Sequence, residues 1–280
     1  MFKRYLRPLL SGSMLGCLLA FPLQSMQAAL EALQLFARSV LPSLFPFTAC
    51  MLLLTAGKCF PSTSLVCLSL LGGSPTGARL FQDASLTTRQ ARRIAAMTGV
   101  MSPMFFLGTM SLWLQNASAG WLILLCHLLG ALLSGVFFKK ESARVSRISL
   151  PPLPVGQAIL QAASAMLTVG GCITLGTVAA RMAECLFPLL DTLPLALMQC
   201  LLEVTSGCKT LIGLSFPLKL PLLCFTSAFG GLSILLQNAA YWGRHQIALS
   251  QLFLYGLLRG VIAFLVCFVI LLCHPAGFAV

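Results

Sequence analysis

The sequence predicts an all-α, polytopic membrane protein built from two inverted repeats that contain broken or re-entrant helices. Of its 280 residues, 58% are hydrophobic and only 9% are charged, and the mean hydropathy is +0.95. Soluble domains carry about 25% charged residues, so the composition indicates a membrane protein. Short polar motifs rich in glycine and proline recur inside apolar runs, a pattern typical of transporter substrate sites.

The N-terminal region, residues 1–29, predicts a transmembrane helix with a basic start and an apolar run over 8–24. A cleaved signal peptide is the alternative, because a charged start, an apolar middle and small residues at the end fit both. An amphipathic stretch, 31–42, follows, and Pro42 and Pro46 are expected to break it before the next apolar run.

The first repeat is predicted over residues 30–118. Its run 60–72 is shorter than the roughly 20 residues that cross a bilayer, and it ends in Gly-Gly-Ser-Pro-Thr-Gly, which predicts a re-entrant half-helix. Run 94–114 is interrupted at Gly99 and again at Ser102-Pro103. Residues 119–155 are expected to form a connecting helix and a cytoplasmic linker whose basic residues are Lys139, Lys140, Arg144 and Arg147.

The second repeat is predicted over 156–243, with a C-terminal transmembrane helix over 244–280. It has the same plan: a polar motif after an apolar run, then a run interrupted by glycines at 230–231. The 89–93 loop carries three arginines, whereas its counterpart at 214–219 carries only Lys219. The positive-inside rule places these loops on opposite sides, which predicts that the repeats are inverted.

Two similar motifs supply the strongest candidates for a binding site. Residues 74–80 read Ser-Pro-Thr-Gly-Ala-Arg-Leu and 204–210 read Val-Thr-Ser-Gly-Cys-Lys-Thr, so each has a glycine two residues before a cation. A cation at bilayer depth costs about 2.5–3.5 kcal/mol even on lenient scales. Arg79 and Lys209 are therefore expected to meet an anionic solute near the midplane. The alternatives are an internal ion pair with Glu203 or snorkelling to the interface.

The remaining candidates surround the helix breaks. Glu203 has three readings: pairing with Lys209, binding a coupling ion, or contacting the solute. Arg259 has two equally favoured readings: it lines the path of the solute, or it forms a structural pair. The predicted substrate-binding residues are Gly77, Ala78, Arg79, Thr98, Gly99, Ser102, Glu203, Thr205, Ser206, Gly207, Lys209, Gly230, Gly231, Ser233, Gln237 and Asn238.

Other functional classes find little support in the residues. No nucleophile motif or phosphate-binding loop is present, so the chain is not expected to be an enzyme. The twelve cysteines are scattered without a Cys-x-x-Cys, and the three histidines lie far apart, which predicts no metal site and no cofactor. The net charge of +12 fits cytoplasmic loops rather than nucleic-acid binding. The expected partners are a small anionic solute and membrane lipid, with a homo-oligomer possible.

Five blocks of this sequence resemble the YlbJ-type sporulation integral membrane proteins. They read GSPTGARL, LTTRQA, SPMFFLGT, LEVTSG and FGGLSILLQ, and they cover 73–80, 86–91, 102–109, 202–207 and 229–237. That family belongs to the nucleoside-recognition or gate-domain group and is similar to concentrative nucleoside transporters. The resemblance implies transport of dipicolinic acid across the outer forespore membrane during sporulation, by a multi-pass protein of that membrane. A nucleoside-type transporter and a non-transporting scaffold for spore-envelope assembly are the alternatives.

Overall fold

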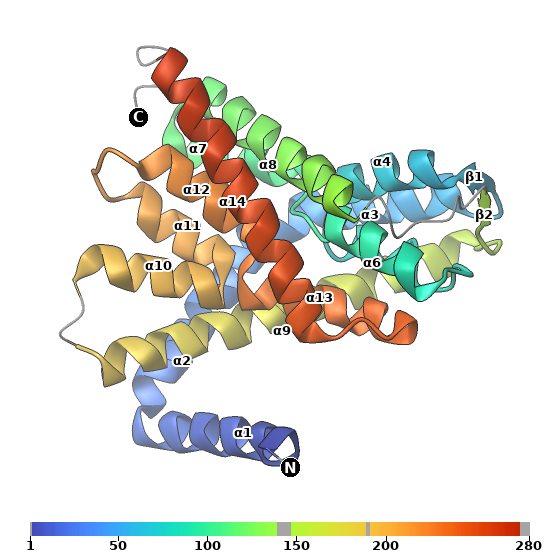
Figure 1. Cartoon of the computed structure of the whole chain (residues 1–280). Helices are drawn as coiled ribbons and strands as arrows, with labels where there is room; N and C mark the ends of the chain where they lie inside the picture. The colour runs from blue at the N-terminus through green and yellow to red at the C-terminus, as the bar shows by residue number, and fades with distance from the viewer. Residues whose placement is uncertain (1, 139–146, 189–190, 275–280) are drawn as a thin grey trace.

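The computed structural model describes residues 2–138, 147–188 and 191–274. Within these residues, five helical segments are long and apolar enough to cross a membrane: 22–55, 117–137, 155–186, 219–245 and 249–273. The chain is therefore a multi-pass membrane protein with an all-α architecture (Figure 1). The expected linker cations Lys139, Lys140 and Arg144 lie outside the described residues.

The N-terminal part is helical almost throughout, in four segments: α1 (Phe2–Ala20), α2 (Pro22–Leu35), η1 (Phe36–Val40) and α3 (Leu41–Thr55). The predicted break at Pro42 and Pro46 is wrong, because helix continues from residue 22 to 55. The wide π-helical turn of η1 lies just before Pro42 and accommodates the missing backbone donor. The apolar part of α1, residues 11–20, is shorter than a membrane span.

The next part of the chain alternates half-helices with sharp turns. Its elements are β1 (Cys59–Pro61), α4 (Ser62–Gly72), α5 (Thr76–Arg79), α6 (Thr88–Met97), η2 (Phe105–Met110), α7 (Ser111–Leu114), α8 (Ala117–Phe137) and β2 (Arg147–Ser149). Helix α4 ends where Gly73 has a φ of 65°, a conformation that favours glycine. Helix α6 begins at a capping box in which Thr87 and Gln90 exchange hydrogen bonds.

The last part has a similar order of elements after one long helix. Its elements are α9 (Val155–Leu186), α10 (Thr192–Leu202), α11 (Val204–Ile212), α12 (Lys219–Phe229), α13 (Gly231–Trp242), η4 (Gly243–His245) and α14 (Leu249–Cys273). Helix α12 ends at Gly230, whose φ is 87°. The expected helix breaks near 73, 99, 203 and 230 all coincide with helix ends.

The two ends of the bundle are built differently. At one end, β1 pairs antiparallel with β2, and Arg244 forms an ion pair with Asp83; we call this the β end. At the other end, the end of α7 packs with the residues after α11, with Leu114, Leu214 and Phe216 in one apolar cluster. Figure 1 shows β1 and β2 at the right and the α11–α12 connection at the left. The helix breaks lie between these ends.

Candidate functional site

The first two helix breaks touch each other in the middle of the bundle. The amide of Ser74, between α4 and α5, donates to the carbonyl of Val100 over 2.6 Å. A Cβ on Gly73 would lie 2.4 Å from the backbone nitrogen of Ser102. Only glycine permits this approach, so the Gly-Ser-Pro turn and the 98–102 break form one unit.

The other two breaks form a second unit. Glu203 separates α10 from α11, and Gly231 follows the end of α12. A Cβ on Gly231 would lie 2.6 Å from the carbonyl oxygen of Cys200 in α10. The hydroxyl of Ser233 lies 3.5 Å from a Glu203 carboxylate oxygen, to which it donates.

Amide side chains of α13 join the two units. The hydroxyl of Ser74 lies 3.2 Å from both Gln237 Oε1 and Asn238 Oδ1, and it has one proton to donate between them. Asn238 Nδ2 donates to the carbonyl of Gly99 over 3.3 Å. Gln237 and Asn238 are both buried. The four predicted breaks therefore form a single polar centre.

A small cavity lies at this centre, and we call it the central cavity. Its volume is about 30 Å³, and its polar lining comes from Ser43, Ser74, Ser102, Thr205 and Gln237. The hydroxyl of Ser102 is buried and has no partner among the described residues. Buried polar atoms normally have a hydrogen-bonding partner, so this hydroxyl is suited to bind a water molecule or a polar solute atom.

Glu203 acts as the N-cap of α11. It is fully buried, and its carboxylate accepts the amides of Thr205 (2.9 Å) and Ser206 (2.6 Å). These bonds and the positive end of the helix dipole stabilise its negative charge. Of the three readings of Glu203, the pairing with Lys209 is not found in the part of the chain that the structure describes.

The two motif cations line separate cavities. Arg79 is half-buried in a cavity of about 100 Å³ near the β end. Its Nη1 donates to the carbonyl of Gln161 over 3.3 Å, and its guanidinium lies 5.9 Å from the Tyr241 ring centroid. Lys209 is exposed in a cleft of about 520 Å³, which Arg38 and Ser206 also line.

The structure therefore does not bring Arg79 and Lys209 together at the midplane. Each follows a break by several residues, and its half-helix leads away from the centre: α5 toward the β end and α11 toward the opposite end. Neither cation lines the central cavity.

Both motif glycines permit close helix packing. A Cβ on Gly77 would lie 2.6 Å from the carbonyl oxygen of Ser69 in α4, and one on Gly207 would lie 2.3 Å from the nitrogen of Cys200 in α10. Ala78 is fully buried in an apolar cluster. These three predicted binding residues hold the half-helices against each other.

Arg259 links the ends of two broken helices. It is 2% exposed, and its guanidinium donates to carbonyls at the end of α6, including Thr98 (2.9 Å) and Ala96 (3.1 Å). It also donates to Ala228 in α12 over 3.3 Å. The negative ends of both helix dipoles thus meet one cation. Thr98 and Gly99 serve this contact through their carbonyls.

Sequence reasoning left three residues out of the predicted site: Ser43, Ser74 and Arg38. Ser74 lies in the recognised Gly-Ser-Pro turn, and that turn was the available signal. Ser43 and Arg38 lie beside the π-helical turn and Pro42, so the local irregularity was visible. Their positions facing α9, α11 and α13 depend on packing that the sequence does not display.

The comparisons with known proteins give one informative match. No protein family profile matches the chain, and no solved structure matches it. The chain is similar to the sporulation integral membrane protein YlbJ of Bacillus subtilis (strain 168), with 27% identity over 261 residues and coverage of 75% of this chain. It spans 64% of the length of that curated relative. This similarity, together with the five sequence blocks, supports membership of the chain in the YlbJ-type family.

Proposed function

We propose that this chain transports a small anionic metabolite, and that dipicolinic acid crossing the outer forespore membrane during sporulation is that solute. One observation carries the proposal: a polar central cavity, formed where four helix breaks meet, lies between two cavities that each contain a cation. A sporulation role is supported by the name of the similar YlbJ protein. The substrate comes from the family resemblance and from the cations.

The orientation of the half-helices supports an inverted repeat. The α4–α5 turn points its open end toward the β end, where Asp83 pairs with Arg244. The α10–α11 turn has its open end at the opposite side, where Leu214 packs with Leu114. Basic residues at the β end include Lys58, Arg89, Arg92, Arg93, Arg147 and Arg244. The positive-inside rule assigns this end to the cytoplasm.

Cysteine labelling tests this topology. Ser85 and Ser215 are exposed in the connections of the two units, and each is replaced by cysteine in a chain without its native exposed cysteines. We expect a membrane-impermeant maleimide to label Ser85→Cys only from the cytoplasmic side and Ser215→Cys only from the other. Labelling of both from one side refutes the inverted arrangement.

The cations give the path a preference for anions. Arg38 and Lys209 line the 520 Å³ cleft together with Glu31, whose carboxylate pairs with Arg181. Arg79 lines the cavity near the β end together with Asp83, whose carboxylate pairs with Arg244. Positive charge in a cleft raises the local concentration of anions. Between them, the hydroxyls and the Gln237 amide of the central cavity supply hydrogen bonds without a fixed charge. A bound anion is thus attracted at both approaches and held weakly at the centre.

The central cavity is closed to a solute in this conformation. A volume of about 30 Å³ holds about two water molecules, which is far less than a pyridine dicarboxylate needs. Transport therefore requires one of the two units to move away from the other. Movement of repeats around a fixed midplane site is how many transporters alternate access.

Uptake into proteoliposomes tests the function. We expect wild-type protein to accumulate radiolabelled dipicolinate, and a Ser102→Ala variant to accumulate it more slowly because the unpartnered hydroxyl is lost. Ser85→Ala, at an exposed serine in the connection after α5, is the matched control. The Arg79→Ala/Lys209→Ala double variant should lose most uptake. Absence of dipicolinate uptake by the wild type, or full uptake by the double variant, refutes this mechanism.

A nucleoside-type solute is the second candidate. It is favoured by the lining of the central cavity, which among the described residues contains hydroxyls and an amide but no charged side chain. The same proteoliposomes separate the two candidates: uridine uptake that excess dipicolinate does not reduce supports the nucleoside reading. Uptake of neither compound favours the non-transporting scaffold.

A further inference from the structure

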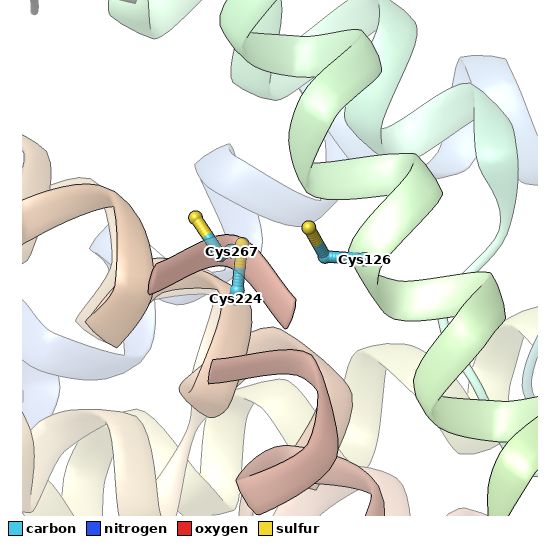
Figure 2. A group of neighbouring side chains, drawn as sticks. All are labelled: Cys126, Cys224 and Cys267. Atoms are coloured by element: carbon cyan, nitrogen blue, oxygen red, sulfur yellow. The ribbon is translucent and has the colours of Figure 1, made fainter. Parts of the chain in front are cut away.

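Three cysteines that are far apart in the sequence meet inside the bundle. Cys126 lies in α8, Cys224 in α12 and Cys267 in α14. Their sulfur atoms all lie within 4.8 Å of one another, and Figure 2 shows the three side chains approaching from three separate helices. We call this group the thiol cluster. Scattered cysteines that merely fill space have no need to converge in this way.

The surroundings of the thiol cluster are apolar. All three cysteines have 0% exposure and belong to an apolar cluster that includes Ile123, Leu223 and Ala263. Along the helices, the cysteines lie about 8–14 Å from the ends remote from β1 and β2, at 1.5 Å per residue. No carboxylate or imidazole belongs to the group of ligand atoms found there. Sulfur is thus the only ligand type that the described side chains offer.

We propose that the thiol cluster is a binding site for a soft monovalent metal ion, Cu(I). Thiolate and thioether ligands select Cu(I) over hard cations, which take oxygen ligands. Structural zinc sites instead use four ligands, almost always in a tetrahedron. Three sulfur ligands in an apolar pocket therefore fit Cu(I) better than Zn²⁺.

The separation of the sulfurs is compatible with a three-coordinate site. With a metal–sulfur distance of about 2.3 Å, a flat trigonal site has its sulfurs about 4 Å apart. Three sulfurs at the observed limit of 4.8 Å lie about 2.8 Å from their common centre. Each sulfur then needs to move inward by at most about 0.5 Å, which small side-chain rotations provide.

Charge balance limits how the ion binds. When Cu(I) replaces one thiol proton, a Cu–S bond forms, an S–H bond breaks and the proton leaves to solvent, so the site stays neutral. The other two sulfurs complete the coordination through their lone pairs. Loss of further protons would leave net negative charge in apolar surroundings, which is costly. A monovalent ion suits this site because one proton is enough to balance it.

The test measures copper on the full chain in detergent, reduced and kept without oxygen. The protein competes for Cu(I) with the chromophoric chelator bathocuproine disulfonate, and copper per chain is then determined by mass spectrometry. We expect wild type to retain one more copper ion per chain than the Cys126→Ala/Cys224→Ala/Cys267→Ala variant. A matched control, Cys17→Ala/Cys172→Ala/Cys185→Ala, removes three cysteines outside the cluster and should bind as wild type does.

X-ray absorption on the copper-loaded wild type keeps the proposal testable if the triple variant does not fold. Three sulfur neighbours are expected, and each single Cys→Ala variant should show two. Equal copper retention by wild type and the cluster variant overturns the proposal, as does a copper site with nitrogen or oxygen neighbours. Preferential retention of Zn²⁺ from an equimolar mixture overturns the choice of Cu(I).

Discussion

Arg259 is a buried cation whose removal should destabilise the fold. It donates five hydrogen bonds, to the carbonyls of residues 95, 96, 98, 99 and 228, and is 2% exposed. Arg259→Met keeps the length of the side chain but removes every donor. The buried Thr98 carbonyl at the end of α6 then loses its bond to Arg259, and the ends of α6 and α12 lose the cation that both helix dipoles face.

The size of the effect follows from these contacts. Each buried group left unsatisfied costs about 1–3 kcal/mol. The Thr98 carbonyl loses its 2.9 Å bond to Arg259, whereas the Ala96 carbonyl still accepts a hydrogen bond from Ser134 Oγ over 2.8 Å. The substitution also relieves the desolvation of the guanidinium. Arg259 faces carbonyls rather than a carboxylate, and hydrogen bonds to a charged group contribute about 1.5–3 kcal/mol, so we expect a loss of about 2–3 kcal/mol for Arg259→Met.

The assay is unfolding of the detergent-solubilised protein in increasing denaturant, followed by tryptophan fluorescence. Trp242 is fully buried and stacks on Phe81, so its fluorescence emission reports on packing at the end of α13. Arg244→Met is the control, because it breaks only the exposed ion pair with Asp83, which is worth about 1 kcal/mol or less. Arg259→Lys should have an unfolding midpoint between those of the wild type and Arg259→Met, because one ammonium group cannot reach both helix ends. Equal unfolding midpoints for Arg259→Met and Arg244→Met would refute this account.

Three further predictions concern the helix breaks. Gly207→Ala should destabilise the protein by about 1–3 kcal/mol, because the added Cβ would lie 2.3 Å from the Cys200 nitrogen. Gly171→Ala is the control, since a Cβ at Gly171 meets open space. Equal unfolding midpoints for the two variants would contradict the packing role of Gly207. Glu203→Ala should cost about 1–3 kcal/mol for each orphaned amide of α11, measured by the same unfolding assay, and an unchanged midpoint contradicts the cap. Thr87→Ala should cost about 1 kcal/mol through loss of the capping box. Amide hydrogen exchange in the first turn of α6 should then be faster than in the wild type, and unchanged exchange would contradict the capping role of Thr87.

Local features of the sequence predicted the elements well. Glycine and proline set where helices end, so the interruptions near 73, 99, 203 and 230 were recognisable. A Thr-Thr-Arg-Gln stretch predicted the start of α6, and Thr87 caps it. The failure at Pro42 and Pro46 has a local cause of another kind: the π-helical turn before them absorbs the distortion.

Some of the predicted binding residues line the central cavity and others do not, and their binding of a solute stays a prediction. Ser102, Thr205 and Gln237 line the central cavity as part of the expected site. Gly77 and Gly207 lie where helices approach closely, outside the lining of that cavity. Periodicity and motif similarity do not distinguish a glycine that approaches a solute from one that approaches a neighbouring helix, because both need the same absence of a side chain.

The sequence by itself determined the membrane class and the positions of the breaks, because hydropathy and backbone preference are properties of short segments. Only the tertiary structure decided which breaks touch, that Arg79 and Lys209 lie in separate cavities, and that Arg259 joins α6 to α12. It also brought together Cys126, Cys224 and Cys267. These contacts join residues far apart in the chain, and the physical reason they form is the packing of whole helices, which fixes neighbours that no local pattern specifies.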